Sequence, residues 1–208
     1  MRNRLICLVC LALLSTFSFA QQKAPPSEAT PVDIPSICSS NMPNNIVVNC
    51  GFEEGNFNHW DLEGDLSFTG VADYAANSGD FGAFFGAIGD FNFLTYNFHV
   101  IVGQNYHLEF WLANQAGGTP NEVKVRWVSG LFDVTVLDLV DQDPSDWTLY
   151  TFGPLPTDDF NSRLEFSFRH DPDFWYLDDV DIELQSAGPA PAALSDHQAE
   201  RGAGNAQP

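Results

Sequence analysis

The sequence predicts an all-β domain, a two-sheet antiparallel β-sandwich with jelly-roll topology. Between residues 45 and 185, apolar residues recur at every second position, and clusters of Gly, Pro, Asn and Asp separate the alternating runs. Phenylalanine, with 18 copies in the whole chain, and valine are frequent in these runs, and no window keeps a helical period. Many short strands separated by turn residues are typical of sandwiches and barrels.

We expect ten strands in this region. The alternation is clearest around residues 106–112, 123–127, 164–168 and 180–184, where it places one face on a core and the other toward water. The expected strands cover residues 46–49, 65–72, 81–88, 92–100, 105–114, 121–129, 131–139, 146–153, 162–170 and 174–184.

Residues 1–20 have the pattern of a secretory signal peptide. Arg2 and Arg4 precede an apolar run, and the small residues Ser18 and Ala20 stand where a signal peptidase reads, so we expect cleavage near Ala20. The apolar run is shorter than the roughly 20 residues that span a bilayer, and no later run reaches that length. The sequence therefore predicts an extracellular or periplasmic protein without membrane insertion.

Two further segments flank the expected domain of residues 45–185. Residues 21–44 carry five prolines and few large apolar side chains, which predicts a linker or extended arm. Residues 186–208 are mostly Ala, Gly, Pro and small polar residues, which predicts a disordered tail.

The charge of the chain excludes one class of partner. The formal charge is −20, and loss of residues 1–20 removes two arginines and no acid, which leaves −22. Nucleic-acid affinity comes from neutralising phosphates, so we expect no nucleic-acid binding. An acidic surface suits neutral ligands and divalent cations, although it also serves solubility alone.

Two cysteines remain after the signal peptide, Cys38 and Cys50. A single pair in an exported chain predicts a disulfide. Its expected role is to fasten the N-terminal arm to the first strand. We expect no zinc site, because no second pair of Cys or His has ligand spacing.

Three segments carry a family resemblance. They are Val47–Gly55 followed by Phe57 and Trp60, then Tyr106–Asn114, then Phe174–Val180. In this order they resemble the cenC-type carbohydrate-binding module family of the galactose-binding-like jelly rolls, in the stand-alone form exported by bacteria. The resemblance covers the folded unit, and Cys50 departs from the glycine usual in the family. It implies that Trp60 and Trp175 serve packing.

The resemblance also implies a structural calcium ion between the first and last strands. By parity, Asp178 faces the core with Val180, where a lone carboxylate needs a cation or several donors. We expect Glu53 and Asp178 as side-chain ligands, with Asp80 as a further one, because calcium takes oxygen ligands. Alternatively, backbone N–H groups or an arginine satisfy Asp178. Asp179 is expected to face solvent.

A sugar site requires exposed aromatic rings with polar groups nearby. By strand parity, Trp111 and Tyr150 are the expected aromatic contacts, whereas Trp127 has the parity of the core. The expected polar companions are Glu109, Arg126 and Arg169.

The leading hypothesis is a secreted, monomeric, non-catalytic module that binds polysaccharide or surface glycan. One alternative is a structural or adhesive β-sandwich that binds protein partners. Another is a protein associated with glycoside hydrolases, but no nucleophile-elbow or zinc-protease motif is present, and no two histidines form a ligand pair.

Overall fold

The computed structural model describes residues 35–40 and 44–185. The predicted signal peptide, the predicted tail and most of the predicted linker lie outside the described residues. Within the described ranges, no helix is long and apolar enough to cross a membrane.

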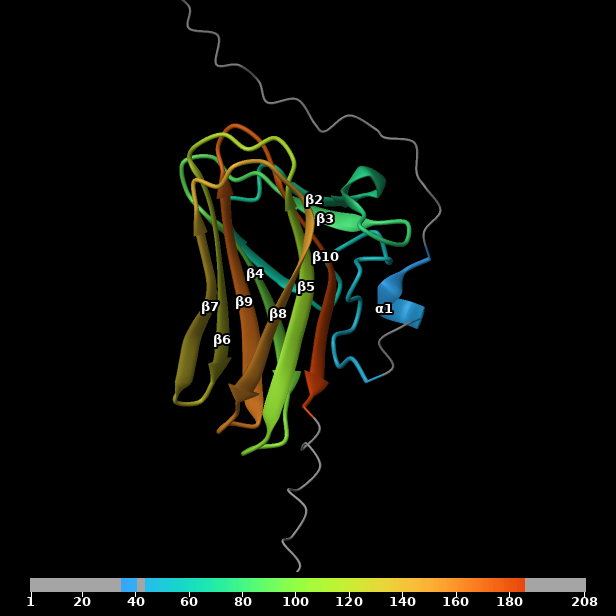
Figure 1. The fold of residues 1–208 in the computed structure, drawn as a ribbon, viewed down its shortest axis with the longest axis vertical. Helices are drawn as coiled ribbons and strands as arrows, with labels where there is room; N and C mark the ends of the chain where they lie inside the picture. Colours follow the sequence, from blue (N-terminus) through green and yellow to red (C-terminus); the bar gives the residue numbers. More distant parts are fainter. Residues whose placement is uncertain (1–34, 41–43, 186–208) are drawn as a thin grey trace, which may run out of the picture.

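The described chain forms two antiparallel five-stranded sheets that pack face to face, which confirms the predicted sandwich (Figure 1). The first sheet has the order β1-β4-β9-β6-β7 and the second has the order β2-β3-β10-β5-β8. The strands of the first sheet are β1 (Asp61–Gly64), β4 (Asn92–His99), β9 (Asn161–His170), β6 (Asn121–Ser129) and β7 (Phe132–Val140). Those of the second are β2 (Thr69–Ala72), β3 (Gly82–Phe85), β10 (Trp175–Leu184), β5 (Asn105–Asn114) and β8 (Ser145–Pro156).

The core lies between the two inner faces. Phe85 of the second sheet stacks on Phe168 of the first, with 4.0 Å between ring centroids. Trp127 is fully buried, as its parity predicted, and its indole N–H donates to the Pro156 carbonyl at 2.9 Å. Trp60 and Trp175 are also buried. Because each large side chain contributes about 2–3 kcal/mol on burial, this aromatic core accounts for much of the driving force.

The predicted strand at residues 46–49 is absent. This segment runs along β10, where Ile46 N–H donates to the Ile182 carbonyl and Val180 N–H donates to the Cys50 carbonyl. Between these two backbone contacts, the Asn45 side chain makes the hydrogen bonds to β10. It donates to the Val180 carbonyl and accepts from Ile182 N–H. A side chain therefore interrupts the ladder that a strand would complete.

The predicted strand at 65–72 is shortened to β2, and sequence reasoning missed β1 before it. Asp65 accepts hydrogen bonds from the backbone N–H and hydroxyl of Ser67, which forms a tight turn. This turn moves the chain from the first sheet to the second. The predicted strand at 81–88 is likewise reduced to β3.

The arm before residue 45 is partly folded, which corrects the expectation of an extended linker there. Residues Ile37–Ser40 form a short helix, α1, and Cys38 is bonded to Cys50 as predicted. Ile37 N–H also donates to the Ser78 hydroxyl at 2.9 Å. The disulfide and this hydrogen bond hold α1 beside β10, on the right of Figure 1.

Candidate functional site

All four lysine and arginine side chains of the described residues lie on one face of the first sheet. Lys124 and Arg126 come from β6, and Arg163 and Arg169 come from the neighbouring strand β9. Val123, Val125, Leu164, Phe166 and Phe168 alternate with them and are fully buried, so the cations occupy the outer face. In a strongly acidic chain, this clustering marks the outer face of the first sheet as distinct.

Each of these cations is held by carboxylates. The Arg126 guanidinium makes a bidentate pair with Asp133, with nitrogen–oxygen distances of 3.2 and 2.6 Å. It also donates to Glu165 at 2.8 Å. The hydrogen bond to Asp133, more than the Coulomb attraction of Glu165, raises the pKa of Arg126. Glu165 also pairs with Arg163 at 3.2 Å. The guanidinium groups are therefore fixed in direction.

The same holds for the other two cations. Lys124 lies 3.4 Å from Glu122 and 3.5 Å from Asp138. Arg169 makes a forked pair with Asp171 at 2.8 and 3.1 Å, which raises the pKa of Arg169 and lowers that of Asp171. The four cations thus have five carboxylate partners, so these groups together carry a formal charge of −1.

A groove of about 400 Å³ opens on this face. Phe91, which immediately precedes β4, and Phe93 in β4 form one wall, and their ring centroids lie 6.4 Å apart. The Phe93 side chain is 43% exposed although it is large and apolar. The remaining lining is Glu122, Lys124 and Arg126 of β6 with Glu165, Phe166 and Ser167 of β9. The groove thus joins aromatic rings to fixed donors and acceptors.

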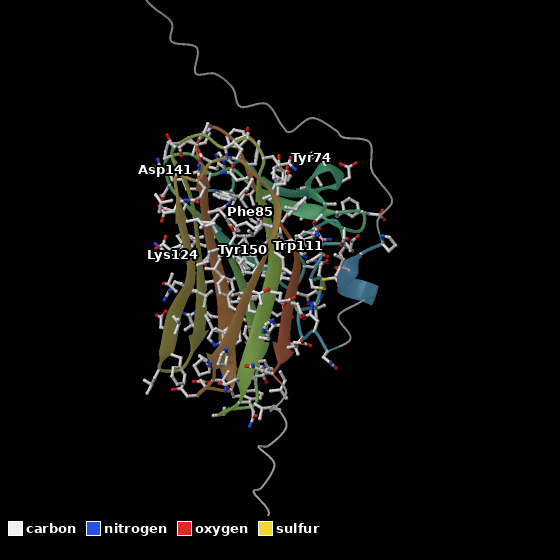
Figure 2. The ribbon with its side chains drawn as sticks, viewed as in Figure 1. Tyr74, Phe85, Trp111, Lys124, Asp141 and Tyr150 are labelled. Atoms are coloured by element: carbon white, nitrogen blue, oxygen red, sulfur yellow. A yellow bond between two sulfur atoms is a disulfide. The ribbon has the colours of Figure 1, made fainter. Side chains whose placement is uncertain are left out.

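The sugar-contact residues predicted from sequence are not brought together. Arg126 and Arg169 lie on the outer face of the first sheet, whereas Trp111 and Glu109 lie on the outer face of the second sheet. Lys124 and Trp111 mark these two sides of the sandwich in Figure 2.

The expected orientation of Tyr150 is wrong. Tyr150 is paired with Phe110 across β5 and β8 and stacks on its ring at 5.7 Å, so it packs on the core. The outward position next to it belongs to Leu149, which is paired with Trp111. The prediction from parity placed Tyr150 outward, whereas in β8 the exposed position belongs to the aliphatic Leu149.

Sequence reasoning also missed Phe91 and Phe93. The signal for Phe93 was present in β4, where Asn92, Leu94, Tyr96 and Phe98 are buried. The outward row is therefore Phe93, Thr95, Asn97 and His99. A phenylalanine in an otherwise polar row is the feature that could have identified the site.

The predicted metal ligands lie on the other side of the molecule, where β10 contains a bulge. The pairing of β10 with β5 shifts between Asp178 and Asp181, and Asp179 has a φ of 50°. The bulge reverses the parity, so Asp178 shares the outer face with Trp111, not the core face with Val180. Asp178 is nevertheless fully buried, because the N-terminal segment covers it.

Asp178 and Asp179 are both satisfied by local donors. Asp178 accepts from the backbone N–H groups of Asn77, Ser78 and Asp179 at 2.7, 3.1 and 2.8 Å. This agrees with the alternative that backbone groups satisfy it. Asp179 was expected in solvent but is buried, and it accepts from the Asn77 and Ser78 side chains. Burial, followed by the charge of Asp179, raises the pKa of Asp178 well above its usual value.

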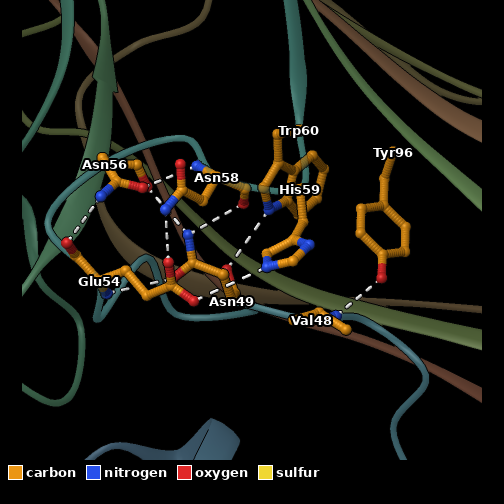
Figure 3. Close-up of polar contacts among 8 residues, drawn as sticks. All are labelled: Val48, Asn49, Glu54, Asn56, Asn58, His59, Trp60 and Tyr96. Atoms are coloured by element: carbon orange, nitrogen blue, oxygen red, sulfur yellow. Dashed lines mark hydrogen bonds and ion pairs between the residues drawn. The ribbon is translucent and has the colours of Figure 1, made fainter.

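Glu53 reaches the same region from the loop after Cys50. The Asn49 side chain organises this loop by donating to the carbonyls of Asn56 and Asn58 and accepting from Glu54 N–H (Figure 3). Glu53 in turn accepts from Asp80 N–H at 2.9 Å, while the Asp80 side chain is exposed. Gly79 has a φ of +71°, and a Cβ there would overlap the Glu53 carboxylate.

Three side-chain oxygens converge beside Gly51. A Cβ on Gly51 would lie 3.4 Å from each of Glu53 Oε1, Asp178 Oδ1 and Ser36 Oγ. Glu53 Oε1 is buried without a hydrogen-bond partner, and burial raises the pKa of Glu53. Among the described residues, no three His, Cys, Asp or Glu side chains are grouped to hold a metal ion, so the two carboxylates need hydroxyl or backbone oxygens as further ligands.

Solved structures share the arrangement of the two sheets. The structure of TmCBM61 in complex with β-1,4-galactotriose aligns with a TM-score of 0.58 and 18% identity, and the match covers 68% of this chain and 99% of that one. The chain shares the two-sheet fold of that module.

Two further structures support the assignment of the fold. The C-terminal family 22 carbohydrate-binding module of Clostridium thermocellum Xyn10B aligns with a TM-score of 0.50 and 12% identity over 69% of this chain and 96% of that one. The enzymatically active domain of bacteriophage CBA120 tailspike protein 4 aligns with a TM-score of 0.52 and 14% identity. This match covers 68% of the present chain but 22% of the tailspike chain. No protein-family model and no curated protein matches the sequence.

Proposed function

We propose that the chain is a secreted, non-catalytic carbohydrate-binding module that recognises neutral polysaccharide or surface glycan. The observation that carries this proposal is the groove of the first sheet, in which the exposed ring of Phe93 adjoins ion-paired side chains. The motifs that resemble the cenC-type family and the signal-peptide pattern of residues 1–20 support the same assignment.

The chemistry of the groove suits a sugar. The C–H face of a pyranose packs on an aromatic ring, and its hydroxyl groups both donate and accept hydrogen bonds. Phe91 and Phe93 offer such rings, while Glu165 offers acceptors and Lys124 offers donors. Because the ion pairs already orient these groups, a ligand loses little side-chain entropy on binding.

The balance of charge favours a neutral sugar. The cations of the face are compensated by their carboxylate partners, and the rest of the molecule is acidic. An acidic polysaccharide would therefore meet no net attraction on this face. Glu122 and Glu165 also serve as partners of lysine and arginine, which supports a role in binding and not in hydrolysis.

Retention on glycan tests this proposal. The purified protein is expected to migrate more slowly in native gels that contain β-1,4-galactan or xylan than in gels without polysaccharide. Polygalacturonate should cause no retardation. The proposal predicts that no reducing sugar is released from galactan or xylan on prolonged incubation. Failure to bind any glycan on an array, together with self-association, would favour the adhesive alternative.

We also propose that Glu53, Asp178 and Ser36 hold a calcium ion. The unpartnered oxygen of Glu53 and the convergence of three oxygens beside Gly51 support this assignment. Asp80 enters the proposal only as a backbone donor to Glu53. The charge of the cation would offset the cost of burying these carboxylate oxygens and fasten the N-terminal segment to β10.

Removal of calcium is expected to lower the melting temperature. A chelator such as EGTA should destabilise the protein, and excess CaCl₂ should restore the transition, because an ion that binds only the folded state stabilises it by mass action. Differential scanning calorimetry measures the effect, with Glu53→Gln as the variant that should no longer respond. An identical transition with and without EGTA would contradict the calcium site.

A further inference from the structure

The outward row of β4 continues beyond the groove. Phe93 borders the groove, and Thr95, Asn97 and His99 follow it on the same face of the strand. On the neighbouring strand β9, the paired outward residues are Ser167, Glu165, Arg163 and Asn161. The two strands thus present a continuous double row that runs from the groove to the opposite end of the sandwich.

A second aromatic contact stands at the far end of this row. The His99 and Phe160 rings stack with 4.3 Å between centroids and 14° between planes. Phe160 is 55% exposed, and Val100 N–H donates to its carbonyl at 3.0 Å, which anchors the loop to the end of β4. A pocket of about 550 Å³ includes both rings in its lining. One ring supports the other, so the exposed face of Phe160 is held in place.

The surface between the two aromatic contacts is polar and partly exposed. Asn97 donates to Asp61 at 2.8 Å, and Arg163 is paired with Glu165 at 3.2 Å. These groups resemble those of the groove itself, since both donors and acceptors are fixed by neighbours. His99 lies six positions after Phe93, which corresponds to roughly 20 Å along a strand. Several sugar rings in sequence would fit over that distance.

We propose that the double row and the His99–Phe160 pair form an extension of the groove, so that the protein binds an internal stretch of an extended polysaccharide. This inference rests on the proposed function and specifies its ligand as a long chain instead of a monosaccharide or a chain end. His99 and Phe160 then contact a sugar several units away from the one on Phe93.

Chain length is the variable that tests this inference. Affinity is measured by isothermal titration calorimetry for β-1,4-galacto-oligosaccharides and β-1,4-xylo-oligosaccharides, from disaccharide to hexasaccharide, with the wild type and the Phe160→Ala variant. Affinity of the wild type should rise with length up to the longest oligosaccharides. The affinity of Phe160→Ala for the hexasaccharide should be about tenfold lower than that of the wild type, as expected for the loss of one stacking contact. Its affinity for the disaccharide should be unchanged.

Leu131→Ala is the matched control, because Leu131 is 93% exposed in the turn between β6 and β7 and lies outside the row. It should leave the affinity for every length unchanged. Equal affinity of the wild type for disaccharide and hexasaccharide, or an unaltered hexasaccharide affinity in Phe160→Ala, would overturn the extension and leave the groove intact. Absence of binding at every length would overturn the proposed function, and this inference with it.

Discussion

Replacing Phe93 by alanine is expected to weaken binding of β-1,4-galactan by about 30- to 150-fold. The Phe93 ring is the large exposed aromatic of the groove, and truncation of an aromatic hot spot costs roughly 2–3 kcal/mol. Because the side chain is 43% exposed and points away from the core, the substitution should leave the melting temperature nearly unchanged. Affinity electrophoresis gives the affinities, and calorimetry gives the stability.

Phe132→Ala is the matched control for this prediction. Phe132 begins β7 in the same sheet, is 38% exposed and does not line the groove. Its loss should not change galactan binding. Equal affinities of Phe93→Ala and the wild type would remove the groove as the glycan site, whereas a similar loss in both variants would indicate a non-specific effect of surface aromatics.

Replacing Asp181 by asparagine is expected to stabilise the protein by about 2–3 kcal/mol at pH 7 and hardly at all near pH 3.5. Asp181 is 5% exposed, and its Oδ1 atom has no hydrogen-bond partner. Burial, followed by the charges of Glu183 and Glu109, raises the pKa of Asp181 to about 6 from 3.8. His107 lowers the pKa of Asp181, but by less than burial and the two glutamates raise it. The folded protein therefore carries an unfavourable charge at neutral pH.

The sign of this pH dependence follows from proton binding. Between pH 3.8 and about 6, the unfolded chain has lost the Asp181 proton while the folded chain retains it, so stability falls as the pH rises through this window. Asparagine cannot lose a proton, so the stability that Asp181→Asn gains over the wild type should increase as the pH rises through the same window. Urea unfolding at several pH values measures it, and Asp143→Asn on the exposed β7–β8 connection serves as the control. A gain that is constant with pH would show that the charge is not its cause.

Period-two patterning predicted the sandwich because nearly every strand has one face in the core. It was accurate for β9 along its whole length, and for β5 and β6 up to their last three residues, which are all buried. It failed at β8, where Tyr150 packs on the core and the aliphatic Leu149 faces outward. It failed again at Asp178, because a bulge changes parity without changing composition.

The candidate site was harder to predict than the fold. Arg126 and Arg169 were found because charged residues in a strand must face outward, but parity alone does not say which of two sheets a strand joins. Trp111 was selected with them although β5 belongs to the second sheet. Only the strand order places β9 between β4 and β6, and it thereby brings Phe93 into the same groove as Arg126 and Lys124.

Chemical-shift mapping tests the central claim most directly. A titration of the ¹⁵N-labelled protein with a soluble β-1,4-galacto-oligosaccharide should shift the backbone amides of β4, β9 and β6, with the largest changes around Phe93 and Arg126. Perturbations centred instead on Trp111 and Leu149, on the outer face of the second sheet, would contradict the assignment of the binding face.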